Sequence, residues 1–138
     1  MRYALDLTPD DNDTILVTSR EFPGATFGDD VEDALRHGLN YIESVLQTKI
    51  ADREPIRPSR AKGMHFVELP ALSVAKIQLH NAMLKRDLRK ADLVRMLKWK
   101  PTQVDRLLDL RHASRLEQLE QAFGALGLRL EIGVKDAA

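Results

Sequence analysis

The chain has 138 residues, of which 43% are hydrophobic and 30% are charged, and it contains no cysteine. This length supports one ordinary domain or two small ones, and the lack of cysteine excludes disulfides and thiol chemistry. No apolar run approaches the roughly 20 residues of a membrane-spanning helix, and the start of the chain lacks the apolar segment of a signal peptide. We therefore expect a cytoplasmic protein.

A net charge of zero conceals two halves of opposite charge. Residues 1–55 contain five Lys or Arg and twelve Asp or Glu, whereas residues 56–138 contain sixteen and nine. Most of the positive excess lies between Lys85 and Arg115, where ten basic residues accompany four aspartates. This division favours two binding surfaces over a single active site.

The first half begins with strand and turn signals. Apolar residues alternate over Tyr3–Thr8, and Thr14–Thr18 is rich in β-branched residues, so these segments predict a hairpin around the turn Pro9–Asp13. The turn Phe22–Gly24 leads into a short third strand over Ala25–Phe27.

A long amphipathic helix is predicted over Asp30–Lys49 because apolar residues recur there at helical spacing. Asp29 and Glu32 fit a capping box at its start. Gly38 falls on the apolar side of this helix, where a strand would approach closely.

The order of elements predicts an α+β fold with two domains. Ala51–Gly63 is typical of a loop, and Met64–Leu69 predicts a strand that returns to the first sheet. Residues 1–70 then form a ββ(β)αβ domain with the helix on one sheet face, and residues 71–138 form a helical domain ending in a short strand.

Four helices are predicted in the second domain. They cover Leu72–Arg86, Ala91–Leu97, Pro101–Leu108, and a fourth segment that Ser114 and Glu117 open as a capping box.

The end of the second domain predicts a self-associating strand. Gly127 is placed to end the fourth helix in the left-handed conformation. Leu128, Leu130 and Ile132 then alternate as a strand whose open edge calls for a partner. Pairing through Leu128–Val134 predicts a homodimer or a higher homo-oligomer.

The second and third of these helices fit a helix-turn-helix. Leu93, Leu97, Trp99, Val104 and Leu107 are expected to face inward. The start of the third helix would then enter the major groove of DNA, with basic residues on phosphates. The residues expected to contact DNA are Lys98, Lys100, Thr102, Gln103, Arg106, Arg111 and His112.

The segment Leu93–Leu108 resembles the helix-turn-helix of the Cro/repressor class, with two departures. Val94 stands where that class usually has a small residue, and Lys98 stands where it usually has a glycine in left-handed conformation. The alternative interpretation is that the basic stretch is only the solvated face of a small helical bundle.

Six motifs follow one another along the chain: Phe22–Asp29, Glu32–Ala34, Phe66–Pro70, Leu72–Lys76, Leu110–Ser114 and Ala125–Leu128. In their order and spacing they resemble the HicB antitoxin family. The resemblance implies a partial RNase H-like first domain and a second domain that represses the operon. Its implied partners are operator DNA and HicA, a small basic toxin that cleaves mRNA.

The acidic first domain would bind the basic toxin. An inhibitor surface usually presents a few anchors near an exposed loop, and acidic and aromatic residues combine near one turn. The candidate toxin-binding residues are Glu21, Phe22, Phe27, Asp29 and Asp30.

No enzyme motif is found, and no cofactor or metal site is expected. The four histidines are scattered without metal-ligand spacing. Asp6 occupies a first-strand position that an RNase H-type nuclease would use for metal ions, but we favour the simpler interpretation that it lies on the solvent face of an alternating strand. A further alternative is a stand-alone transcriptional regulator whose first domain senses a small molecule.

Overall fold

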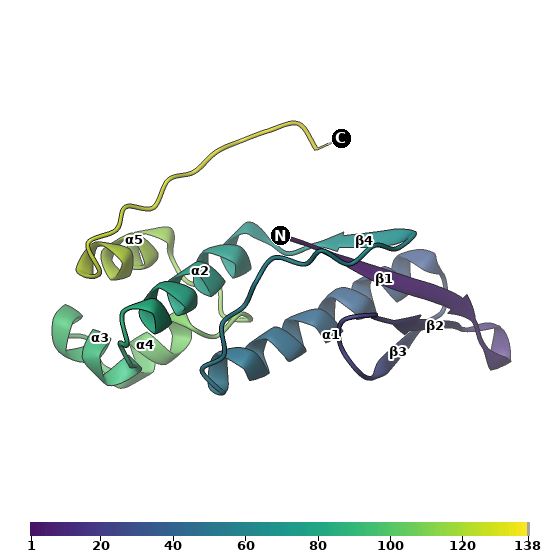
Figure 1. Cartoon of the computed structure of the whole chain (residues 1–138), viewed down its shortest axis with the longest axis horizontal. Coiled ribbons are helices and arrows are strands. Elements are labelled where there is room, and N and C mark those ends of the chain that lie inside the picture. Colours follow the sequence, from purple (N-terminus) through teal and green to yellow (C-terminus); the bar gives the residue numbers. More distant parts are fainter. Residues whose placement is uncertain (138) are drawn as a thin grey trace. The chain divides into compact units, whose positions relative to one another are not determined.

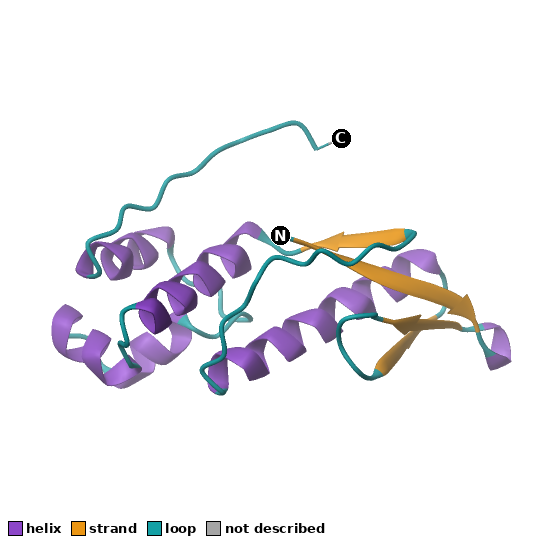
Figure 2. Ribbon diagram, viewed as in Figure 1, coloured by secondary structure: helices purple, strands orange, loops and turns teal. Residues whose placement is uncertain are grey.

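The structure is a computed structural model that describes residues 1–137. The chain divides into two compact units, residues 1–74 and the residues from 75 onward. The first unit holds a four-stranded antiparallel sheet and one long helix, and four helices follow (Figures 1 and 2). The predicted α+β order is therefore confirmed at this level. Among the described residues, no helix is both long and apolar enough to cross a membrane.

The sheet of the first unit has the order β3-β2-β1-β4, with antiparallel neighbours throughout. A short 3-10 turn, η1 (Asp11–Asp13), joins β1 to β2. The predicted return of the fourth strand to the first sheet is confirmed, because Tyr3 in β1 lies opposite Val67 in β4. The strands are β1 (Arg2–Pro9), β2 (Ile15–Thr18), β3 (Ala25–Gly28) and β4 (His65–Glu68).

Helix α1 (Val31–Ala51) packs against all four strands. Gly38 lies on its buried side, where an added Cβ would overlap the Leu5 side chain and lie 3.2 Å from Val17 Cγ1. The close approach predicted at this glycine is confirmed. It allows the helix axis to lie near β1 and β2, so that Ile42 and Leu46 are almost completely buried.

The start of α1 differs by one residue from the sequence prediction. Asp30, not Asp29, is the N-cap, and its Oδ1 accepts the N–H of Asp33 at 2.7 Å. Asp33 in turn accepts the N–H of Asp29 at 2.9 Å. Two consecutive aspartates can each cap a helix, and the later one is used here. Asp33 therefore takes the position expected for Glu32, which is exposed.

The loop between α1 and β4 packs on the first unit. Ile56 is only 4% exposed, and the Ser59 hydroxyl donates to the carboxylate of Glu21. A Cβ added at Gly63 would lie 3.1 Å from the Cβ of Ala4 in β1. The loop therefore covers part of this strand.

The second unit is helical. Its helices pack around aliphatic side chains and one aromatic ring, including Ile77, Met83, Leu93, Leu107 and Phe123. The helices are α2 (Ala71–Lys85), which begins in the first unit, α3 (Lys90–Leu97), α4 (Pro101–Leu107) and α5 (Leu116–Ala125).

Two predictions about the end of the chain are corrected. Ser114 is not the N-cap of α5; Arg115 takes that position, and the Ser114 hydroxyl donates to the Arg106 carbonyl at 3.3 Å. The strand predicted over Leu128–Val134 does not form within the described chain. A strand needs a neighbour to satisfy its backbone groups, and this segment pairs with no strand of its own chain.

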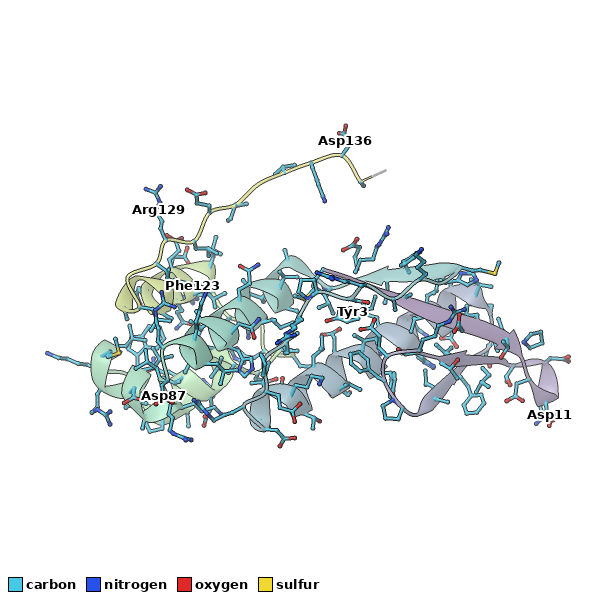
Figure 3. The ribbon with its side chains drawn as sticks, in the orientation of Figure 1. Tyr3, Asp11, Asp87, Phe123, Arg129 and Asp136 are labelled. Carbon is cyan, nitrogen blue, oxygen red and sulfur yellow. The ribbon has the colours of Figure 1, made fainter. Side chains whose placement is uncertain are left out.

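The segment after α5 leaves the helix as extended chain. Gly127 has φ +74, which confirms the predicted left-handed end of α5. Beyond it, Arg129 and Asp136 project from the chain (Figure 3). Ile132 is 70% exposed and Val134 is 97% exposed, so this tail presents apolar side chains to solvent.

Candidate functional site

Helices α3 and α4 and the turn between them have the interior that the sequence predicts. Leu93 in α3 and Val104 and Leu107 in α4 are fully buried. Leu97 and Trp99 are half-buried beside them. This packing fixes α3 against α4 and leaves the opposite side of α4 in solvent.

The turn between α3 and α4 contains a left-handed residue at the position where the Cro/repressor class usually has a glycine. Lys98 has φ 57 and ψ 38, the left-handed conformation that glycine usually provides. A side chain in this conformation costs roughly 1 kcal/mol. Lys98 and Lys100 both project into solvent from this turn.

The predicted DNA contacts on α4 differ in their exposure to solvent. Thr102 and Arg106 are exposed, whereas Gln103 is partly buried. The Gln103 Oε1 atom accepts the N–H of Lys100 at 2.9 Å, so this oxygen caps the helix. Its amide N–H groups can still donate to a base or a phosphate.

The turn after α4 carries two further predicted DNA contacts. Arg111 has an exposed side chain, and its backbone N–H donates to Asp109 Oδ1 at 3.0 Å. His112 is half-buried, with Nδ1 3.1 Å from the Ser114 hydroxyl. Arg111 is therefore better placed than His112 to reach a ligand.

The basic stretch between positions 85 and 115 places its positive charge on the surface. All ten Lys and Arg residues between positions 85 and 115 are exposed. Their side-chain ion pairs with aspartates include Lys90 with Asp105, at 3.1 Å, and Arg95 with Asp92. Exposed pairs of this kind contribute little to stability.

A buried lysine holds the end of α4 and was not identified from the sequence. Lys76 in α2 is 0% exposed, and its Nζ donates to the carbonyls of Arg106, Asp109 and His112 at 2.9, 2.6 and 2.7 Å. Burial lowers the pKa of Lys76 to about 8, and the nearby Asp109 carboxylate partly opposes this effect. The signal in the sequence was a lysine on the apolar side of a helix, directly before Ile77.

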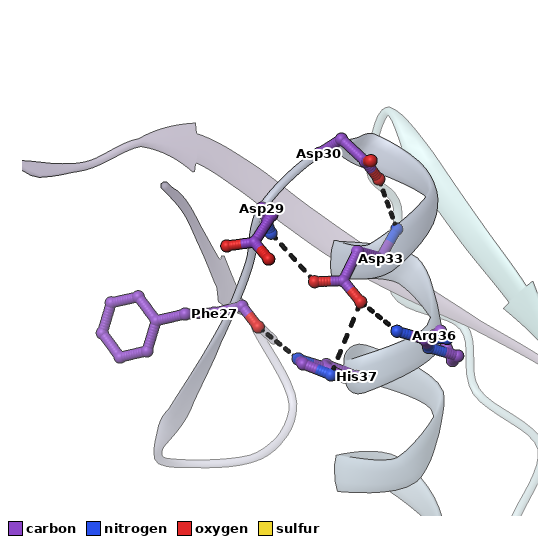
Figure 4. A network of polar contacts seen from close by, with 6 residues as sticks. All are labelled: Phe27, Asp29, Asp30, Asp33, Arg36 and His37. Carbon is purple, nitrogen blue, oxygen red and sulfur yellow. Dashed lines mark hydrogen bonds and ion pairs between the residues drawn. The ribbon is translucent and has the colours of Figure 1, made fainter. Parts of the chain in front are cut away.

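A second cluster surrounds the start of α1 in the first unit (Figure 4). Asp33 pairs with Arg36 and lies 3.6 Å from His37 Nε2, while His37 Nδ1 contacts the Phe27 carbonyl. The hydrogen bond from the Asp29 N–H lowers the pKa of Asp33; burial opposes this, and Arg36 and His37 add to the lowering. The network fixes the end of β3 to α1.

Three of the predicted toxin-binding residues lie at this cluster. Phe27 is 49% exposed, and Asp29 and Asp30 are exposed beside it. The Phe27 ring points away from the polar network (Figure 4). An open apolar ring and two carboxylates thus occupy one corner of the first unit.

The other two predicted toxin-binding residues lie between β2 and β3. Phe22 is partly buried, with its ring centroid 5.9 Å from that of Tyr3. Glu21 is exposed and accepts from Ser59. Burial raises the pKa of Tyr3 to about 12, and the charge of Glu21 adds to this effect. Phe22 therefore serves mainly as packing.

The acidic first unit does not assemble a metal site within residues 1–137. Asp6 instead pairs with Arg20, with 3.0 Å between Oδ2 and Nε. No group of three or more His, Cys, Asp or Glu side chains suited to a metal ion occurs among the described residues.

Comparison with known proteins identifies relatives over most of the chain. The family model described as "HicB_like antitoxin of bacterial toxin-antitoxin system" matches residues 2–78. Antitoxin HicB 2 of Photorhabdus laumondii is 30% identical over 96% of this chain and 95% of its own length. Antitoxin HicB of Pseudomonas fluorescens is 36% identical over 80% of this chain and 77% of its own. Antitoxin HicB of Escherichia coli K12 is 27% identical over 96% and 98%.

These relatives are antitoxins, not enzymes, as the sequence predicted for this chain. The family match spans the whole sheet and α1, and the similarity to these relatives extends over the helical unit as well. The chain belongs to the HicB family of antitoxins.

Proposed function

We propose that the first unit binds and neutralises a HicA-type toxin that cleaves mRNA. The observation that carries this proposal is the family match over residues 2–78, which includes all of the sheet and α1. Membership of an antitoxin family implies a toxin partner. The three-stranded meander followed by α1 also supports a reduced RNase H-like fold for this unit.

The surface we assign to the toxin is the corner formed by Phe27, Asp29 and Asp30. A partly exposed aromatic ring is a typical interface anchor, and neighbouring carboxylates would speed association with a basic partner. Binding there would cover the toxin surface that receives RNA.

The test is association of the full chain with a purified HicA-type toxin. We expect Asp29→Lys to weaken binding about tenfold, because it replaces attraction with repulsion at the interface. Asp11→Lys is the control, because this substitution makes the same change of charge. Asp11 lies in the exposed turn between β1 and β2 (Figure 3). Equal effects of the two variants would contradict this surface.

We also propose that the helix-turn-helix represses the antitoxin's own operon by binding operator DNA. The exposed basic residues on the turn and on α4 support this role, since cations on this motif contact phosphates while the start of the second helix reads bases. Thr102 and Arg106 are the base-reading candidates, and Gln103 contributes through its amide N–H groups. Lys98, Lys100, Arg111 and the half-buried His112 are the phosphate candidates.

Operator binding is tested with the DNA upstream of the gene and with DNA of random sequence. Arg106→Ala should cost about 1–3 kcal/mol of operator affinity. Lys98→Ala should instead weaken binding to both DNAs, and it should reduce the slope of log affinity against log salt concentration by about one. Lys62→Ala is the control, because Lys62 is an exposed lysine of the first unit. Equal affinity of the wild type for both DNAs would contradict sequence-specific repression.

The tail supports dimerisation. We propose that Leu128–Val134 pairs with the same segment of a second chain, which would supply the missing strand neighbour and cover Ile132 and Val134. A dimer would present two copies of α4 about 34 Å apart on a palindromic site. Sedimentation of a variant with Ile132→Lys and Val134→Lys tests this: the wild type should be dimeric and the variant monomeric.

A further inference from the structure

One lysine in the second unit is buried, unlike the ten exposed basic residues between positions 85 and 115. Lys76 is completely buried, and each of its three N–H bonds points to a different backbone carbonyl. The ammonium has no donor left for a phosphate or a carboxylate. Lys76 therefore contributes its charge to the interior of the unit and not to a surface contact with DNA.

The three carbonyls belong to the end of α4 and the turn that follows it. The last carbonyls of a helix have no partner inside the helix, and a cation at that end is favoured by the helix dipole. Arg106 is in the last turn of α4, and Asp109 and His112 lie three and six residues further on. One ammonium thus connects the segment 106–112 to α2.

The same segment carries three of the proposed DNA contacts. Arg106 and Arg111 have exposed side chains, and His112 is half-buried. Their spacing on DNA depends on the path of the backbone from α4 into the next turn, and the carbonyls that define this path are those that Lys76 holds. A shift of this path would move all three side chains together.

We propose that Lys76 is a positioning residue for operator binding: from α2, it holds the backbone of residues 106–112 so that Arg106, Arg111 and His112 reach one stretch of DNA together. The proposal rests on the DNA-binding function proposed above. It assigns to a buried lysine a role that its position outside the helix-turn-helix would not suggest.

The first experiment measures the affinity of full-length Lys76→Met for operator DNA. Methionine fills nearly the same space but cannot donate, so the three carbonyls lose the ammonium and keep only their local donors within residues 109–114. We expect operator affinity to fall at least about tenfold, because the backbone that carries Arg106, Arg111 and His112 is no longer held to α2. Toxin affinity should stay within about twofold, because the first unit is unchanged. Lys85→Met is the control: Lys85 lies on the same helix and is exposed.

The second experiment separates positioning from general stability and applies even where Lys76→Met does not fold. In Lys76→Ala, propylammonium has the size and the donors of the missing part of the side chain. Adding it should restore operator affinity to within about threefold of the wild type, whereas tetramethylammonium, which has no N–H, should not.

Three outcomes overturn the proposal. One is a folded Lys76→Met chain with wild-type operator affinity, the second is the absence of rescue by propylammonium, and the third is equal rescue by tetramethylammonium. Failure of the wild type itself to prefer operator DNA would instead remove the proposed repressor function. The two failures are therefore distinguishable.

Discussion

The two units of this antitoxin bury different groups at their centres. In the first unit, the 21-residue helix α1 packs aliphatic side chains on a sheet and approaches it at Gly38. In the second unit, α4 has only 7 residues, and a lysine ammonium is buried at its end.

Helix length explains this difference. Every helix leaves four N–H groups and four carbonyls without partners inside it, whatever its length. In a short helix these groups are a large share of the backbone, so their partners decide whether the helix is stable in one position. The first unit depends mainly on close packing, whereas the second also depends on polar contacts to helix ends. The predictions below separate these two dependences.

The largest effect is expected from Gly38→Leu. The new side chain would overlap Leu5, and overpacking of a core typically costs about 1–3 kcal/mol and occasionally more. Hydrogen exchange of the β1 and β2 amides should accelerate. The fluorescence of Trp99, the only tryptophan of the chain, should change little, because Trp99 lies in the second unit.

Gly124→Ala is the control for this substitution. Gly124 lies in α5 with nothing within 4 Å of an added Cβ, so alanine should stabilise the second unit by about 0.5–1 kcal/mol. Equal losses of stability in the two variants would show that Gly38 is needed for something other than space.

The buried ammonium predicts a distinctive titration. The pKa of Lys76 is lowered from 10.5 to about 8. Between these values the unfolded chain binds more protons at this residue than the folded chain, so the Lys76 contribution to the free energy of unfolding rises with pH. It is fully present above about pH 10.5 and is lost as the pH falls through about 8.

NMR titration of the lysine Nζ signals measures this directly. One signal should titrate near pH 8 and should be absent in Lys76→Met. A single titration near 10.5 for every lysine would show that burial of Lys76 has no effect on its proton.

A smaller effect is expected at the start of α1, where two aspartates are adjacent. Asp30→Ala removes the acceptor for the Asp33 N–H and should cost about 1 kcal/mol. Asp29 contributes its backbone N–H to this network, so Asp29→Ala should change stability by less than about 0.5 kcal/mol. Urea denaturation of the two variants checks the order, and the reverse order would place the N-cap at Asp29.

The smallest effect is expected at the left-handed turn of the second unit. Lys98→Gly should relieve the strain of a side chain at φ 57, with part of the gain offset by greater freedom of the unfolded chain. We expect a net stabilisation of about 0.5 kcal/mol, combined with weaker DNA binding. A stabilised variant that also binds DNA more tightly would contradict a phosphate contact at Lys98.

The strands and long helices were predictable because each has a strong period. Alternation identified β1, and apolar residues at helical spacing identified α1. The N-cap of α1 was predicted one residue too early, at Asp29 instead of Asp30. Both aspartates are good caps, and the local sequence does not distinguish them. At α5 the N-cap is Arg115 and not Ser114, because the Ser114 hydroxyl donates to the Arg106 carbonyl instead of capping the helix.

Two features depend on contacts that periodicity does not encode. Lys76 was not identified because a pattern of apolar residues gives a lysine no place in the core, whereas the structure supplies three carbonyls for it. The strand at Leu128–Val134 was predicted from alternation, but a single chain offers it no neighbour. Helical spacing predicted which residues of α4 lie away from the core. It did not predict that Gln103 Oε1 accepts the N–H of Lys100 and so caps the helix.

The close approach of α1 to the sheet at Gly38 limits which amino-acid substitutions homologous chains can accept. A chain with a side chain at position 38 needs smaller residues at positions 5 and 17, since all three share one space between α1 and the sheet. Substitutions at these positions are therefore expected to occur together or not at all. Among homologous antitoxins, covariation of positions 5, 17 and 38 would record this geometric constraint.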